Sequence, residues 1–204
     1  MNYLAHAYLS FGNEEILLGN MTSDFIKGKK QFLYPPVVHK GILLHRAIDD
    51  FTDSHPITQK AKSVFKAAYR LYSGAFIDVV YDHFLAIEPT AFANEVALYD
   101  FSQTTYQQLE KQKPIMPPQF EHLFFYMQSQ NWLYGYRTLP GIYQSFGGLV
   151  KRAAYLHDST PAIKIFDQHY HFLQSCFDEF WEEMRIFAFN KMTQLLSDNR
   201  TLPC

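Results

Sequence analysis

Apolar residues recur along this chain with the period of an α-helix. Between Gly41 and Pro56 they fall every three or four positions and form a broad band, and charged residues occupy the other side of the same stretch. No segment alternates apolar and polar residues over the length of a convincing strand. The pattern predicts helices over residues 2–11, 14–26, 41–56, 57–72, 74–86, 90–113, 120–136, 140–155 and 162–196, the last with room for a break. We therefore expect an all-α fold.

Glycine and proline mark the expected ends of several helices. Gly28 is placed to stop the helix over residues 14–26, Pro89 ends the one over residues 74–86, and Thr90 can cap the next. The segment PIMPP at residues 114–118 is the clearest break, but the apolar helical pattern resumes directly after it. A length of 204 residues suits one domain with a sizeable core. We expect a single-domain helical bundle over residues 1–204.

Composition excludes several classes of protein. A formal net charge of −2 argues against a general nucleic-acid binder. The first residues, MNYLAHAYLSFGNEE, lack the basic start and long apolar run of a signal peptide, and no apolar stretch is long enough to span a bilayer. Two cysteines, Cys176 and Cys204, make no disulfide framework. We therefore expect a cytoplasmic protein with no nucleic-acid partner and no membrane span.

The stretch over residues 41–56 places ionisable side chains among apolar ones. His45 and Asp49 are four residues apart and share one face of the predicted helix, as do Arg46 and Asp50. Such pairs are common structural ion pairs, each stabilising a helix by roughly 0.2–0.5 kcal/mol. The alternative is that His45 and Asp49 belong to a metal or phosphate site. This segment alone leaves both interpretations open.

A second helix strengthens the case for a metal site. Asp78 and Asp82 also share a face, and residues 74–86 contain no lysine or arginine. Two carboxylates about 6 Å apart repel each other by roughly 3 kcal/mol at an effective dielectric near 20. That repulsion becomes tolerable if a cation lies between them or one stays protonated. With Asp24, a third acid in apolar surroundings, the sequence predicts a site for a hard divalent ion.

Several further residues admit a structural or a functional interpretation. A lone histidine such as His6 is typically a core residue, and His83 and His169 are equally candidates for structural or acid–base roles. Basic residues cluster early in the chain, at Lys27, Lys29 and Lys30, either as a solvated loop or as a docking patch. The sequence contains no GxxxxGK[ST], GxGxxG, GxSxG or HExxH motif, which excludes phosphate loops, a serine nucleophile elbow and zincins.

Five segments together resemble one protein family. They are NYLAHAYL at residues 2–9, GILLHRAID at 41–49, IDVVYDHFL at 77–85, WLYGYR at 132–137 and DQHY at 167–170. The combination resembles the bacterial acyl carrier protein phosphodiesterase family. The resemblance implies a helical fold like that of HD-type metal phosphohydrolases. It also implies hydrolysis of holo-acyl carrier protein, an acidic partner, to the apo protein and 4′-phosphopantetheine, with Mn²⁺ or Mg²⁺ as cofactor.

The ligand set cannot be transferred by position, because HD enzymes are named for a His-Asp dipeptide and this chain has Asp82-His83 instead. From the residues themselves we predict four metal ligands: Asp24, His45, Asp78 and Asp82. Asp49 is either a ligand or the partner that holds the His45 imidazole.

The expected reaction assigns roles to further side chains. The ion would activate water for attack on phosphorus, and a histidine, His83 first and His6 second, would protonate the departing serine oxygen. Arg46 or Arg137 would hold the phosphoryl oxygens, although an ordinary ion pair explains either arginine equally well.

The carrier protein would dock on the lysine patch of Lys27, Lys29 and Lys30. Two alternatives stay open. One is a metal phosphohydrolase acting on a nucleotide or another small phosphoester, and the other is a non-catalytic helical module that binds an acidic partner.

Overall fold

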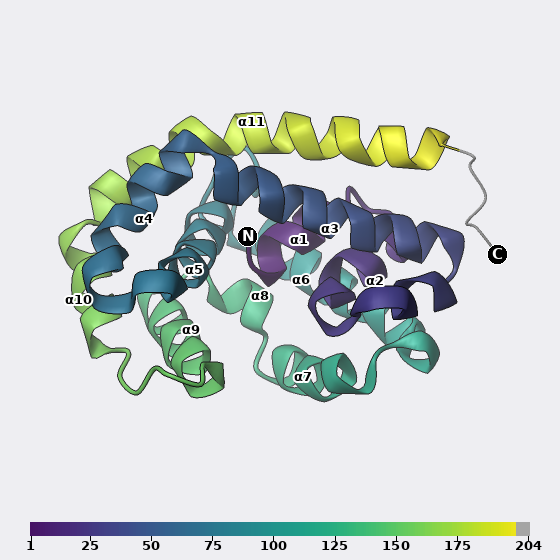
Figure 1. Cartoon of the computed structure of the whole chain (residues 1–204), viewed down its shortest axis with the longest axis horizontal. Helices are drawn as coiled ribbons and strands as arrows, with labels where there is room; N and C mark the ends of the chain where they lie inside the picture. Colours follow the sequence, from purple (N-terminus) through teal and green to yellow (C-terminus); the bar gives the residue numbers. More distant parts are fainter. Residues whose placement is uncertain (199–204) are drawn as a thin grey trace.

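Helices make up the regular structure of residues 1–198, which a computed structural model describes (Figure 1). The described residues contain no strand, so the all-α prediction is confirmed. The α-helices are α1 (Tyr3–Tyr8), α2 (Glu14–Thr22), α3 (Pro36–Ser54), α4 (Pro56–Tyr69), α5 (Ser73–Ala86), α6 (Glu95–Lys111), α7 (Pro118–Ser129), α8 (Trp132–Gly135), α9 (Leu139–Arg152), α10 (Thr160–Gln168) and α11 (Tyr170–Ser197). Short 3₁₀ helices add η1 (Ser23–Phe25), η2 (Gly28–Leu33), η3 (Arg70–Tyr72) and η4 (Lys113–Ile115).

Capping explains where the observed helices depart from the expected ones. Thr90 does not begin α6; its backbone and hydroxyl instead donate to the Glu88 carboxylate, and the Asn94 side chain caps the helix. The segment predicted as one helix over residues 120–136 is divided into α7 and α8 at Asn131, which has a left-handed backbone (φ 48°). The break expected in the last helix falls at His169, between α10 and α11.

Helix α3 runs through the molecule and packs against α2 and α11 (Figure 1). Two glycines permit the close approach of α2 and α3. A Cβ atom at Gly19 would lie 2.0 Å from the Val38 carbonyl oxygen, and one at Gly41 would lie 2.4 Å from the Ile16 carbonyl oxygen. Any larger residue would push the helices apart. This contact brings the end of α2 next to the middle of α3.

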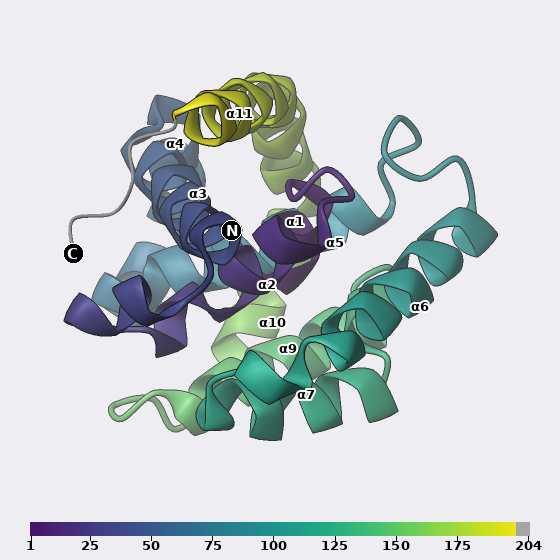
Figure 2. The ribbon, with the colours of Figure 1, turned by 90° about the vertical axis from the view of Figure 1, so that its right-hand side faces the viewer.

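The short N-terminal helix lies inside the protein. Figure 2 shows α1 and α2 between α3 and α11 on one side and α6, α7 and α9 on the other. Helix α1 packs against α2 and α5. The largest fully buried side chains of the protein are mostly tyrosines and phenylalanines. The N-terminal residues therefore lie between helices on two sides and can contribute to an internal site.

The structure also bears on the expectations for a membrane span and for the cysteines. Among residues 1–198, no helix is both long enough and apolar enough to cross a membrane. Cys176 is a buried free thiol. Cys204 and the last residues of the expected domain over 1–204 lie outside the described residues.

Candidate metal centre

Four side chains from three helical segments meet beside α3. His6 comes from α1, Asp24 from η1, and His45 and Asp49 from α3. His6 Nε2 lies 3.2 Å from Asp49 Oδ1, and His45 Nε2 lies 3.1 Å from Asp49 Oδ2 and 3.2 Å from Asp24 Oδ1. The potential ligand atoms of His6, His45 and Asp49 all lie within 4.8 Å of one another. We refer to the four residues as the His–Asp cluster.

Asn20, on α2, orients both imidazoles of the cluster. His6 Nδ1 lies 2.8 Å from the Asn20 Oδ1 atom, and His45 Nδ1 lies 2.7 Å from the Asn20 backbone oxygen. The Asn20 amide nitrogen donates to the His6 carbonyl, which fixes Oδ1 as the acceptor. Each Nδ1 therefore carries a proton, and both Nε2 atoms point into the cluster, where the neutral form of either ring would offer a lone pair. The two rings stack with centroids 4.0 Å apart.

The cluster has a charge pattern that favours a cation. Burial and the neighbouring His45 lower the pKa of His6 to about 4, despite the attraction of Asp49. Burial alone would lower the pKa of His45, but hydrogen bonds with Asp24 and Asp49 raise it to about 9. Burial opposes ionisation of Asp49, yet His6, the N-terminal amine and His45 hold the pKa of this carboxyl well below its usual range. In the absence of metal, a proton on His45 thus occupies a position between two carboxylates.

The donor set fits a divalent transition-type ion. His6 Nε2 is buried and makes no hydrogen bond of good geometry, although Asp49 is close. An unpaired imidazole lone pair beside carboxylate oxygens is a combination that Mn²⁺ and similar ions bind. Asp24 lies at the rim, where its side chain is 73% exposed. The cluster opens into a cleft of about 440 Å³, lined by Ser23, Asp24, Ile26, Lys27, Gly28, His45, Arg46, Asp49 and Asp50.

Asp82 has a different environment from the one expected of a metal ligand. It is fully buried, and its two oxygens accept hydrogen bonds from the backbone N–H groups of Asn2 (3.2 Å), Leu4 (2.7 Å) and Ala5 (3.2 Å). No side chain at Asn2 caps α1, so Asp82 supplies the missing acceptor from another helix. Burial raises the pKa of Asp82 to about 7, although the backbone donors favour its charged form.

Asp78 also has a partner of its own. Its Oδ1 atom accepts a hydrogen bond of 2.9 Å from the Met1 amine, which also lies 3.4 Å from Asp49 Oδ1. Asp78 and Asp82 thus have two separate sets of hydrogen-bond donors, and the cation expected between them stays a prediction. The sequence shows the like charges on one helix face, but it does not show the N–H groups that satisfy them.

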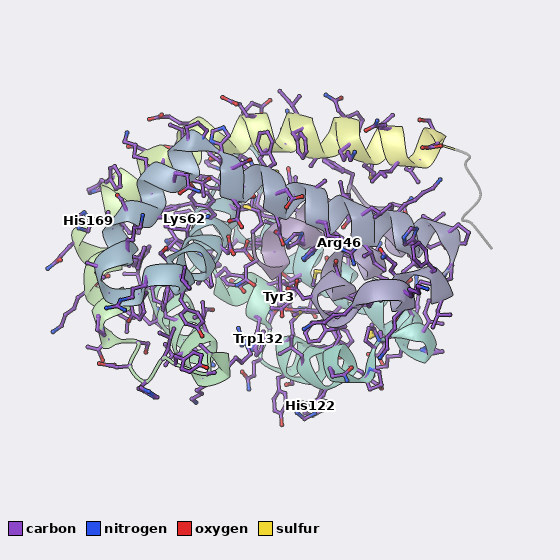
Figure 3. The ribbon with its side chains drawn as sticks, in the orientation of Figure 1. Tyr3, Arg46, Lys62, His122, Trp132 and His169 are labelled. Atoms are coloured by element: carbon purple, nitrogen blue, oxygen red, sulfur yellow. The ribbon has the colours of Figure 1, made fainter. Side chains whose placement is uncertain are left out.

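The structure also separates the other histidines from the cluster. His83, named first as the proton donor, is buried with Nδ1 2.7 Å from the Tyr136 carbonyl and Nε2 3.1 Å from the Tyr170 hydroxyl. Both ring nitrogens are therefore in use. His169 is exposed at the junction of α10 and α11, and Figure 3 places it at the outer end of the molecule, away from Tyr3.

The two arginines have different positions. Arg46 lines the cleft of the cluster and donates a hydrogen bond of 2.7 Å to Gln31. Arg137 forms an ion pair with Glu95 and does not line that cleft. Of the two residues expected to hold phosphoryl oxygens, the structure brings only Arg46 to the cluster.

The lysine patch lies next to the cluster. Lys27, Lys29 and Lys30 are all exposed around η2, and Lys27 lines the same cleft as Asp24. The described residues give none of the three an ion pair. Positive charge is thus available at the entrance to the site.

Sequence reasoning did not assign Asn20 and underestimated His6. Asn20 is a fully buried polar residue within the otherwise apolar and small segment ILLGNM. A buried amide in such a segment is a usable signal, since it requires specific partners. His6 gives no comparable local signal, because its neighbours in the cluster come from α2 and α3.

Comparisons with known proteins identify the family of this chain. Residues 1–184 match the family model described as acyl carrier protein phosphodiesterase. Acyl carrier protein phosphodiesterases from Yersinia pestis and Serratia proteamaculans (strain 568) are 35% and 33% identical over 184 residues, covering 90% of this chain and 95% of each relative. That from Escherichia coli O139:H28 is 32% identical over 191 residues, covering 94% of this chain and 99% of the relative. No solved structure matches the chain. The chain belongs to the acyl carrier protein phosphodiesterase family.

Proposed function

We propose that this protein hydrolyses the phosphodiester of holo-acyl carrier protein, releasing 4′-phosphopantetheine, with Mn²⁺ or Mg²⁺ held by the His–Asp cluster. Family membership supports the substrate. One structural observation carries the metal assignment: the Nε2 atoms of His6 and His45 are directed at the carboxylate of Asp49 by hydrogen bonds from their Nδ1 atoms to Asn20.

A divalent ion bound there would neutralise phosphoryl oxygens and lower the pKa of a coordinated water. The protein's own residues would position the ion, the water and the phosphoryl group. Asn20 keeps both imidazoles in the tautomer that ligation requires, and Asp49 balances the positive charge. Asp24, exposed at the rim and held ionised because its bond to His45 lowers its pKa, can orient an incoming water. Arg46, beside the same cleft, can donate two hydrogen bonds to the non-bridging oxygens.

The proposal includes a relation to HD-type metal phosphohydrolases. Its support is a pair of histidines combined with aspartates on an all-helical framework. In this chain the histidine and aspartate of one helix, His45 and Asp49, are one turn apart and not adjacent. The Asp82-His83 dipeptide contributes neither residue to the cluster.

Substrate docking forms another part of the proposal. The exposed Lys27, Lys29 and Lys30 would attract an acidic carrier protein and orient it towards the cleft. Next to them Phe32 is 46% exposed and Leu33 84% exposed, so the same surface offers apolar contacts. A cytoplasmic location is proposed too, supported by the free thiol of Cys176.

A direct assay tests the proposed function. Protein stripped with EDTA is incubated with holo-acyl carrier protein, with and without added Mn²⁺, and intact mass spectrometry follows loss of the phosphopantetheine group. We expect conversion to the apo protein only when the ion is present. Undiminished conversion by metal-free protein would refute the metal assignment. A Mn²⁺- or Mg²⁺-loaded protein that cleaves nucleotides but leaves the holo protein intact would refute the substrate.

A further inference from the structure

A second cavity shares no lining residue with the cleft of the His–Asp cluster. Its volume is about 450 Å³, within the range of pockets that hold small organic ligands. Residues from α1, α8 and α9 form its walls, and none of them belongs to the cluster. The lining consists of Asn2, Tyr3, Gln130, Trp132, Gly135, Tyr136, Gly141, Gln144, Ser145, Gly147, Gly148, Lys151 and Arg152. We call it the α1–α9 cavity.

The lining combines amide, aromatic and basic side chains. The side-chain amides of Asn2, Gln130 and Gln144 can each donate and accept hydrogen bonds. Trp132 and Tyr136 provide flat apolar surface, and glycines in α8 and α9 leave backbone open to the cavity. Lys151 and Arg152 make the cavity positive, and its lining contains no acidic side chain.

The floor of the cavity is rigidly supported. The Asn2 amide donates a hydrogen bond of 3.0 Å to the Tyr136 hydroxyl, and His83 Nδ1 donates one of 2.7 Å to the Tyr136 carbonyl. The buried Asp82 accepts from the backbone of Asn2. The Asp82-His83 dipeptide and the WLYGYR segment, which the cluster leaves unused, therefore both build this cavity.

Tyr3 connects the cavity to the cluster. It lines the cavity and lies three residues before His6, a rise of about 4.5 Å along the helix. Burial raises the pKa of Tyr3 to about 12, with Arg152 acting on it from the cavity side and Asp24 from the cluster side. Figure 3 draws Tyr3 between Arg46, which lines the cleft, and Trp132, which lines the cavity.

We infer that the α1–α9 cavity binds the pantetheine arm of the substrate. This inference rests on the proposed function, which requires a phosphodiester with a carrier protein on one side and pantetheine on the other. The arm has two amides, a hydroxyl and a dimethyl-substituted carbon, and the amide and aromatic lining matches these groups. With the phosphodiester at the cluster, the lysine patch takes the protein side, and the cavity, which Arg152 also lines, takes the arm.

Gly135→Leu tests the assignment, because it places a side chain inside the cavity. A Cβ atom at Gly135 meets no heavy atom within 4 Å, and the residue has no positive φ. The Cβ atom of the new side chain therefore meets open space at a residue that lines the cavity. Ala67→Leu, at an exposed position on α4, is the matched control for added apolar volume.

The probe is free pantetheine, titrated by calorimetry or NMR into Mn²⁺-loaded protein. We expect wild type and Ala67→Leu to bind it, and Gly135→Leu to bind at least about tenfold more weakly, which corresponds to about 1.4 kcal/mol. The KM for holo-acyl carrier protein should rise in the same variant. Gln144→Ala, which removes one amide without adding volume, should weaken pantetheine binding about threefold to tenfold and serves if Gly135→Leu does not fold.

The possible results distinguish a failure of the cavity assignment from a failure of the proposed function. Wild-type protein that cleaves the holo protein but binds no pantetheine, with an unchanged KM in Gly135→Leu and Gln144→Ala, would overturn the cavity assignment and leave the proposed function intact. Wild-type protein that never cleaves the holo protein refutes the proposed function itself.

Discussion

The His–Asp cluster and the aspartate pair on α5 present the same kind of sequence pattern and have opposite environments. In the cluster, His6 Nε2 is a buried nitrogen without a hydrogen bond, close to the Asp49 carboxylate. On α5, Asp82 accepts three backbone hydrogen bonds and Asp78 accepts one from the Met1 amine. Atoms with an unused lone pair can bind an ion, whereas atoms already bonded hold the fold together. The two regions differ in whether their polar atoms already have hydrogen-bond partners.

The largest expected effect follows from removing a cluster imidazole. His45→Ala deletes one of the two Nε2 donors, so we expect Mn²⁺ binding and turnover to fall by more than about a hundredfold, beyond what outer-shell changes cause. Metal content by mass spectrometry and apo-protein formation measure the two quantities. His122→Ala, on the exposed face of α7, is the control (Figure 3). Full metal content in His45→Ala would show that the His–Asp cluster does not hold the ion.

A smaller loss is expected when only the orientation of the imidazoles changes. Asn20→Leu removes the side-chain oxygen that accepts the His6 Nδ1 proton and leaves the backbone oxygen that accepts from His45. It should weaken Mn²⁺ affinity about tenfold to a hundredfold. Calorimetric titration measures the affinity. Ser10→Ala is a matched control, because it removes a hydrogen bond to Asn20 (3.1 Å) that involves neither imidazole. Equal Mn²⁺ affinity in Asn20→Leu and wild type would show that the amide does not position the ligands.

Asp82→Asn examines the other region. An amide has one acceptor oxygen in place of two, so at least one backbone donor of α1 loses its partner, and we expect a loss of about 1–3 kcal/mol of stability. The melting temperature should fall equally in EDTA and in Mn²⁺, since the stability lost does not depend on the ion. A variant that melts like wild type in EDTA, but binds Mn²⁺ poorly, would identify Asp82 as a ligand.

The smallest effect is expected at the lysine patch, where all three residues are exposed. Changing Lys27, Lys29 and Lys30 together to Glu should raise the KM for holo-acyl carrier protein several-fold and flatten its salt dependence, with kcat nearly unchanged. Charge reversal at the exposed Lys60, Lys66 and Lys164, on α4 and α10, gives the same change in net charge and is the control. An unchanged salt dependence of KM in the triple variant would place the docking surface elsewhere.

The fold was largely predictable because helical periodicity is a local property of the sequence. The errors came where capping residues compete, as at Asn94 against Thr90, or where the backbone takes a left-handed conformation, as at Asn131. Neither outcome is visible in the apolar pattern.

The candidate site was predictable only in part. His45 and Asp49 share a helix face, so their spacing indicated a pair. His6 reaches them only because glycines let α2 approach α3 and because α1 packs against α2. The role of Asp82 depends on backbone donors from a distant segment, which side-chain spacing does not reveal.

The location of bound Mn²⁺ tests the central claim most directly. Crystals of the Mn²⁺-loaded protein, measured at the manganese absorption edge, yield an anomalous difference map that positions the ion without reference to activity. We predict a peak within coordinating distance of His6 Nε2, His45 Nε2 and the Asp49 carboxylate. A peak between Asp78 and Asp82, with none at the cluster, would contradict the account.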